Sequence, residues 1–130
     1  MNSLCEMTAT DLRRMIGRKD ISPVELVEAS IDRIEMVDSS LNAVVTKNYE
    51  AARKAAKTAE KSVLDGEMLG MLHGLPIGIK DLEATANVRT TLGSKLYADH
   101  VPTADLGVVA NVRTAGGIIL GKTNTPEFGA

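Results

Sequence analysis

The stretch that decides the fold is VVANVRTAGGIILGKT, residues 108–123, because it places a helix, a glycine turn and an apolar strand one after another. The valines in its first half recur at the spacing of one helix face. Gly116 and Gly117 end that helix, and residues 118–122, IILGK, form the short apolar run typical of a buried, parallel-type strand. This order favours an α/β fold in which helices pack against a sheet.

Four helices are expected, and the second has the strongest start signal in the chain. Ser22 is a suitable N-cap, Pro23 fits the first helical position, and Glu25 can complete a capping box. The expected ranges are 8–18, 22–37 and 49–63, and the fourth helix is expected to begin at Thr103 with Asp105.

A second strand is predicted within HGLPIGIKDL, residues 73–82. Leu75, Ile77 and Ile79 alternate with smaller or polar residues, which is the period-two pattern of a strand with one apolar face. The other face carries a proline and a glycine beside Lys80, so a hollow around the lysine is expected. Taken alone, however, a lysine at a strand end usually faces solvent. A further short strand or extended segment is predicted at 41–46.

Composition bounds the class of protein. A chain of 130 residues with 44% hydrophobic and 25% charged residues suits one globular domain. Three aromatic residues (Phe 1, Tyr 2, Trp 0) and a net charge of −2 give neither a stacking surface nor an electrostatic footprint, so no nucleic-acid or membrane partner is expected. Cys5 is the only cysteine, and neither a signal peptide nor a membrane span is evident, so a cytoplasmic location is expected.

Residues 116–123, GGIILGKT, match the phosphate-loop pattern G-x-x-x-x-G-K-[ST], but their context disfavours nucleotide binding. A phosphate loop follows a strand and precedes a helix, whereas here a helix precedes and the variable positions are stiff strand formers. His73 and His100 have no partner at metal-ligand spacing. No metal and no cofactor is therefore expected.

The last eight residues, TNTPEFGA, contain a helix start without a helix. Thr125 is a fair N-cap, Pro126 fits the first helical position and Glu127 enriches the first turn. The few expected strands would also leave open sheet edges. Both observations predict that residues 1–130 are part of a larger domain.

Five segments together resemble the N-terminal part of the amidase signature enzymes. They are SPVELVEASIDRIE, LNAVV, LHGLPIGIKDL, RTTLGS and VPTADLGVVANVRTAGGIILGKTNTPEFG, in the order and about the spacing seen in that family. The resemblance spans nearly the whole chain. TPEFG makes the chain more similar to general amidases than to the corresponding component of the tRNA-dependent amidotransferases.

The resemblance implies an incomplete amidase signature fold: N-terminal helices plus part of a mixed sheet flanked by helices. It also implies hydrolysis of carboxylic amides by a Ser-cisSer-Lys triad, with Lys80 as the catalytic lysine and Asp81 beside it. Both serines fall in a region that, in the family, follows the match to residues 125–130. The chain departs from the family pattern at Asn87, where glycine is expected in a turn that asparagine also tolerates.

The physics of such a triad explains a lysine in a hollow. Removal from water favours the neutral amine, which can accept a proton through a bridging serine from a nucleophilic serine. Ser94 lies in a glycine-serine turn and Ser22 serves as a cap, so neither is expected to be the nucleophile.

The leading hypothesis is thus an amidase segment in which only the lysine of the triad is present, so that the isolated chain is inactive. Its partner would be a small-molecule amide. Two alternatives remain: a non-catalytic fragment or interaction module that needs a partner, and a piece like the A subunit of a tRNA-dependent amidotransferase. The sequence carries no signal for oligomeric state.

Overall fold

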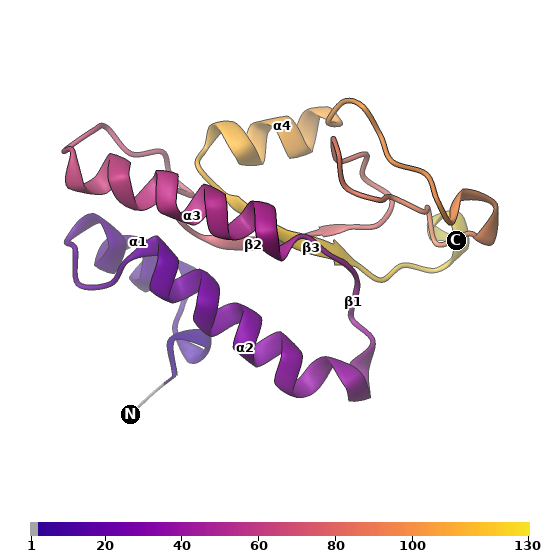
Figure 1. Ribbon diagram of the computed structural model, residues 1–130, viewed down its shortest axis with the longest axis horizontal. Helices are drawn as coiled ribbons and strands as arrows, with labels where there is room; N and C mark the ends of the chain where they lie inside the picture. The colour runs from indigo at the N-terminus through magenta and orange to yellow at the C-terminus, as the bar shows by residue number, and fades with distance from the viewer. Residues whose placement is uncertain (1–2) are drawn as a thin grey trace.

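The computed structural model describes residues 3–130, and these form four α-helices and a three-stranded sheet (Figure 1). In chain order the elements are α1 (Ala9–Gly17), α2 (Pro23–Leu41), β1 (Val44–Lys47), α3 (Tyr49–Leu64), β2 (Pro76–Lys80), α4 (Gly107–Thr114) and β3 (Ile118–Thr123). Short 3-10 turns occupy Leu4–Glu6, Lys95–Tyr97 and Glu127–Gly129. The α/β class expected from the sequence is confirmed.

The sheet is mixed, with strand order β1-β3-β2. β3 lies in the centre, parallel to β2 and antiparallel to β1. Because α4 connects the two parallel strands, β2, α4 and β3 form a βαβ unit. The stretch that predicted the fold thus supplies both the helix and the central strand of this unit.

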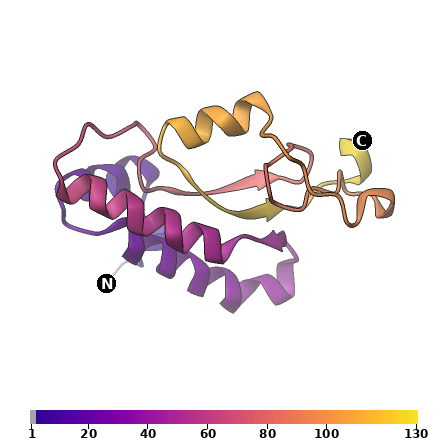
Figure 2. The ribbon, with the colours of Figure 1, turned by 45° about the horizontal axis from the view of Figure 1, so that its top comes forward.

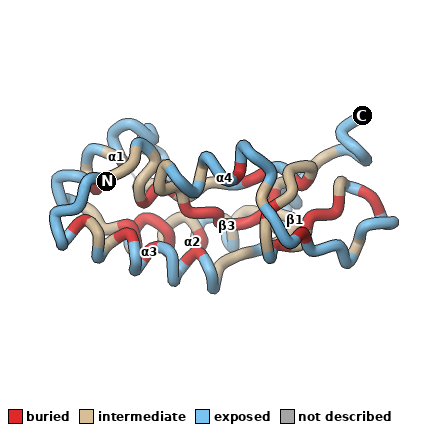
Figure 3. The backbone as a smooth tube through the Cα atoms, turned by 90° about the horizontal axis from the view of Figure 1, so that it is seen from above, coloured by how far each residue is buried: buried red, intermediate tan, exposed pale blue. Residues whose placement is uncertain are grey.

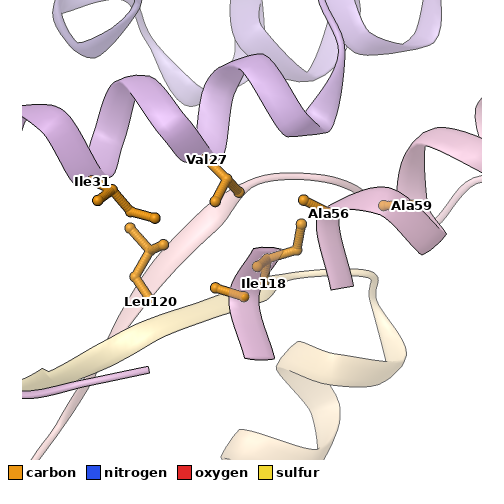
Figure 4. Close-up of a cluster of buried hydrophobic side chains, with 7 residues drawn as sticks. Val27, Ile31, Ala56, Ala59, Ile118 and Leu120 are labelled. Carbon is orange, nitrogen blue, oxygen red and sulfur yellow. The ribbon is translucent and has the colours of Figure 1, made fainter. Parts of the chain in front are cut away.

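Helices cover both faces of the sheet (Figure 2). On one face, Val27 and Ile31 of α2 meet three buried alanines of α3 and, from β3, Ile118 and Leu120 (Figure 4). The alanines let α3 approach closely because they have almost no side chain to accommodate. On the other face, Ile79, Val109 and Ile119 form a smaller cluster beneath α4. Figure 3 shows the buried residues gathered along β3 and on the facing sides of the helices.

The helix starts follow local chemistry. Ser22 Oγ accepts the Glu25 N–H at 3.0 Å and the Glu25 carboxylate accepts the Ser22 N–H at 2.7 Å, so the predicted capping box is confirmed. α2 runs past its expected end at 37 to Leu41. It stops where Asn42 adopts the left-handed conformation (φ 51°) and the Asp38 carboxylate accepts the N–H of Ala43 at 2.7 Å.

Two expected helix starts are wrong. α4 begins at Gly107, because the Asp105 carboxylate is engaged elsewhere: it accepts the N–H of Ala86 at 2.7 Å and an N–H of Arg113 at 2.8 Å. The Thr125 hydroxyl does not cap the final turn but donates to the Pro126 carbonyl at 3.2 Å. A side chain that can cap a helix also binds other backbone groups when the tertiary fold brings them nearer.

Candidate functional site

The candidate site lies at the carboxyl ends of β2 and β3. In the parallel register Lys80 stands opposite Thr123, and Ile79 stands opposite Lys122. The loop 81–106 leaves β2 at this point and gathers at the same end of the molecule as the C-terminal turn (Figure 1). Ligands of open α/β sheets bind at the carboxyl ends of strands, so this is where the fold directs a search for chemistry.

Lys80, the predicted catalytic lysine, is the last residue of β2 and is exposed. No side-chain hydrogen bond or ion pair within residues 3–130 involves its ammonium group. The expected enclosing hollow is therefore wrong for this chain, since Gly78 on the same face is exposed too. The physical reason is that β2 is an edge strand, and α4 covers only the face that carries its isoleucines.

The buried lysine is Lys122, on β3. In the sequence this residue belongs to the phosphate-loop match, which its context disfavoured. Its side chain is 0% exposed, and its Nζ donates to the Glu83 carbonyl and to the Thr90 hydroxyl, each at 2.7 Å. Burial lowers the pKa of Lys122 to about 8, and the negative charges of Asp81 and Glu83 oppose that shift. One signal was available in the sequence: Lys122 lies inside a run predicted to be a buried strand.

Asp81, the residue after Lys80, is 2% exposed and forms hydrogen bonds with the loop 81–106. Its carboxylate accepts the N–H of Thr91 at 3.0 Å and also the Thr91 hydroxyl proton. Its backbone N–H donates to the Thr123 carbonyl at 2.9 Å, and its carbonyl accepts the N–H of Leu92 at 2.9 Å. Every polar group of Asp81 therefore has a partner, which makes this buried carboxylate tolerable.

The other residues considered in the sequence have structural contacts. Ser94 caps the turn Lys95–Tyr97 and donates its hydroxyl proton to Glu127 at 2.9 Å. Asn87 has φ 62°, the left-handed conformation that was expected to preserve this turn. His73 contacts the Ala59 carbonyl through Nε2 at 2.9 Å. Each of these three residues therefore has a structural role in the fold.

Residues 116–123 do not form a phosphate loop. Gly116 and Gly117 form the turn after α4, and the next six residues are β3. The backbone N–H groups of a strand bind the neighbouring strands, so they are not available to cradle a phosphate. The geometry of this motif therefore agrees with the context that disfavoured nucleotide binding there.

A polar hollow of about 360 Å³ lies beside the site, between the loop and the start of β1. Asp81, Arg89, Ser94 and Lys95 line it from the loop, and Thr125 lines it from the segment after β3. Lys80 does not line this hollow, so within residues 3–130 the two features are separate.

In the part of the chain that the structure describes, no group of three or more His, Cys, Asp or Glu side chains could hold a metal ion. None of the helices within residues 3–130 combines the length and apolar character needed to cross a membrane.

Comparison with known proteins identifies the family of the chain and agrees with its fold. The family described as Amidase matches residues 25–130. The chain is 42% identical over 123 residues to an acylamidase of Rhodococcus erythropolis, a match that covers 95% of this chain and 26% of the relative. It is also 42% identical over 122 residues to the A subunit of the glutamyl-tRNA(Gln) amidotransferase of Moorella thermoacetica, covering 94% of this chain and 25% of the relative.

Solved structures match the fold closely. A bacterial aryl acylamidase of the amidase signature family superposes with a TM-score of 0.89 at 36% identity, covering 94% of this chain and 26% of that one. The peptide amidase of Stenotrophomonas maltophilia gives a TM-score of 0.88 at 32% identity, covering 95% of this chain and 26% of that one. The chain belongs to the amidase family, and it spans about a quarter of the length of the curated relatives it matches.

Proposed function

We propose that this chain contributes Lys80 as the catalytic base of an amide hydrolase that uses a Ser-cisSer-Lys triad. The observation that carries the proposal is the family match over residues 25–130 together with the position of Lys80 at the carboxyl end of β2. Its ammonium has no partner within residues 3–130, so it is free to meet groups from other polypeptide. The substrate class we propose is a carboxylic amide, because acylamidases and peptide amidases are among the relatives.

The proposed reaction balances without a cofactor. A nucleophilic serine oxygen attacks the amide carbon, and its proton passes through a bridging serine to the neutral amine of Lys80. The carbon–nitrogen bond then breaks, and the same proton returns to the leaving amine. Water attacks the resulting serine ester, which releases the carboxylic acid and restores the serine.

We infer that residues 1–130 form the N-terminal portion of a single amidase domain and that both serines belong to other polypeptide of the same protein. Such polypeptide would also cover the exposed face of β2 around Lys80. Exclusion of water there favours a neutral lysine amine, which is the form that accepts a proton. With Cys5 as the only cysteine of the chain, we further propose a reducing, cytoplasmic compartment.

The proposal is tested in the full-length gene product by following hydrolysis of the chromogenic amide 4-nitroacetanilide. Lys80→Met keeps a similar side-chain length but cannot accept a proton, so kcat should fall by about 10²- to 10⁴-fold, the usual contribution of a general base. The matched control is Lys54→Met on the exposed surface of α3, which should retain full activity. Unchanged turnover in Lys80→Met would refute the role of this lysine.

The position of the serines has its own test. The 130-residue chain alone should not release 4-nitroaniline, whereas the full-length product should. Turnover by the short chain that disappears with Lys80→Met would mean that residues 1–130 contain a complete catalytic set.

A second candidate function rests on the match to the A subunit of a glutamyl-tRNA(Gln) amidotransferase. A protein of that kind works within an assembly, so the purified product alone would leave simple anilides intact. Co-purification from the source cells, followed by an assay for amide formation on glutamyl-tRNA(Gln), distinguishes the two functions. Activity on anilides without any partner favours the amidase.

A further inference from the structure

Backbone hydrogen bonds anchor the residue after β2 to β3 and to the loop 81–92. The N–H of Asp81 donates to the Thr123 carbonyl, and the Asp81 carbonyl accepts the N–H of Leu92, both at 2.9 Å. Lys80 immediately precedes this anchored residue. The direction in which the Lys80 side chain leaves the strand therefore depends on where the loop 81–92 is fixed.

Lys122 ties the two arms of that loop together. Its Nζ binds the Glu83 carbonyl on the outgoing arm and the Thr90 hydroxyl on the returning arm, each at 2.7 Å. The Thr90 hydroxyl in turn donates to the Val88 carbonyl at 3.0 Å. Since Lys122 stands opposite Ile79 in the parallel register, this cross-link lies one residue from Lys80 along the strand.

A fully buried ammonium is a costly way to join two loop arms. No ion pair within residues 3–130 includes Lys122, so its charge is compensated only by two neutral acceptors and the more distant carboxylates. Charge-assisted hydrogen bonds are, however, shorter and more directional than neutral ones. The two hydrogen bonds of Lys122 therefore fix the position of the loop 81–92 and do not make the fold more stable.

We propose that Lys122 is a positioning residue for Lys80: by cross-linking Glu83 and Thr90 it fixes the loop that aims the lysine at the end of β2. The inference rests on the proposed function of Lys80. Lys122 does not touch the substrate; it acts through the backbone. An error of about 1 Å in the placement of a reacting group can lower turnover by about 10²-fold.

The test uses the full-length gene product with 4-nitroacetanilide and compares Lys122→Met with Thr90→Val, which removes one acceptor at nearly constant volume. We expect kcat to fall by about 10- to 100-fold in Lys122→Met and about 3- to 10-fold in Thr90→Val, with KM changed less than about twofold. The matched control is again Lys54→Met. If Lys122→Met does not fold, Thr90→Val alone carries the comparison.

Each substitution is then repeated in the Lys80→Met background. If Lys122 acts through Lys80, it costs no further residual activity there, whereas a merely structural role lowers activity equally in both backgrounds. Equal losses, or wild-type kcat in both single variants, would overturn the inference. Failure of the proposed function gives a different result, because Lys80→Met itself then remains active.

Discussion

Replacement of Lys122 by methionine should remove a defined pH dependence from the stability of the protein. Burial lowers the pKa of Lys122 from 10.5 to about 8 in the folded chain. Below pH 8 the amine is protonated in both states, and the folded state carries the full cost of a buried charge. Between pH 8 and 10.5 the unfolded chain binds a proton that the folded chain has released, so folding becomes more favourable as the pH rises.

The size of the effect follows from the same two values. The difference between the pKa values of the unfolded and folded states corresponds to roughly 3 kcal/mol in the free energy of unfolding. Of this, about 2 kcal/mol develops between about pH 7 and pH 9.5. Methionine has no titrating group, and the two acceptors that it leaves unpaired, the Glu83 carbonyl and the Thr90 hydroxyl, do not titrate in this range. Relative to Lys122→Met, the wild-type protein should therefore gain about 2 kcal/mol over this interval.

The assay is urea denaturation of both proteins at about pH 7 and pH 9.5, followed by circular dichroism. The surface lysines titrate in both proteins, so their contribution cancels in the difference between wild type and variant. Lys54→Met, at an exposed position, is the control and should show no pH-dependent difference from wild type. A wild-type-minus-Lys122→Met difference that stays constant with pH would contradict the argument that burial sets the ionisation of this lysine.

Three further predictions concern the fold, and each is measured by urea denaturation. Asp81→Asn replaces one of two acceptor oxygens with an amide donor facing Thr91, so it should cost about 1–3 kcal/mol; a cost below about 0.5 kcal/mol would show that these two hydrogen bonds do not hold the loop. Ser22→Ala removes the capping box and should cost about 1 kcal/mol, and no loss would mean that the cap is not used. Gly121→Ala places a Cβ 2.4 Å from the Thr46 carbonyl oxygen on β1 and should cost more than about 2 kcal/mol. Its control, Gly107→Ala, meets no atom within 4 Å and should stay within about 0.5 kcal/mol of wild type. Similar effects at the two positions would be inconsistent with the close approach of β1 to β3.

Local signals predicted most of the regular structure. Capping at Ser22, helical spacing of apolar residues, and the apolar runs before Lys80 and Lys122 each act within a few residues. Each predicted an element that the structure contains. The expected start of the fourth helix failed, because the Asp105 carboxylate binds Ala86, which is distant in sequence. No pattern of neighbouring residues reports such a contact.

The candidate site divides in the same way. Lys80 was identified from its sequence context and from a family resemblance, and its catalytic role remains a proposal. The expected hollow around it is wrong, because small neighbours along a strand leave space but do not decide whether another segment encloses that space. Within residues 3–130 Lys80 is exposed at the end of an edge strand.

By itself, then, the sequence determined the helices, the strands and the family, since capping, periodicity and residue size are properties of short stretches. Only the tertiary structure decided which lysine is desolvated. Burial depends on what folds back over a side chain: the loop 81–92 returns across Lys122 at the centre of the sheet and leaves Lys80 at its edge.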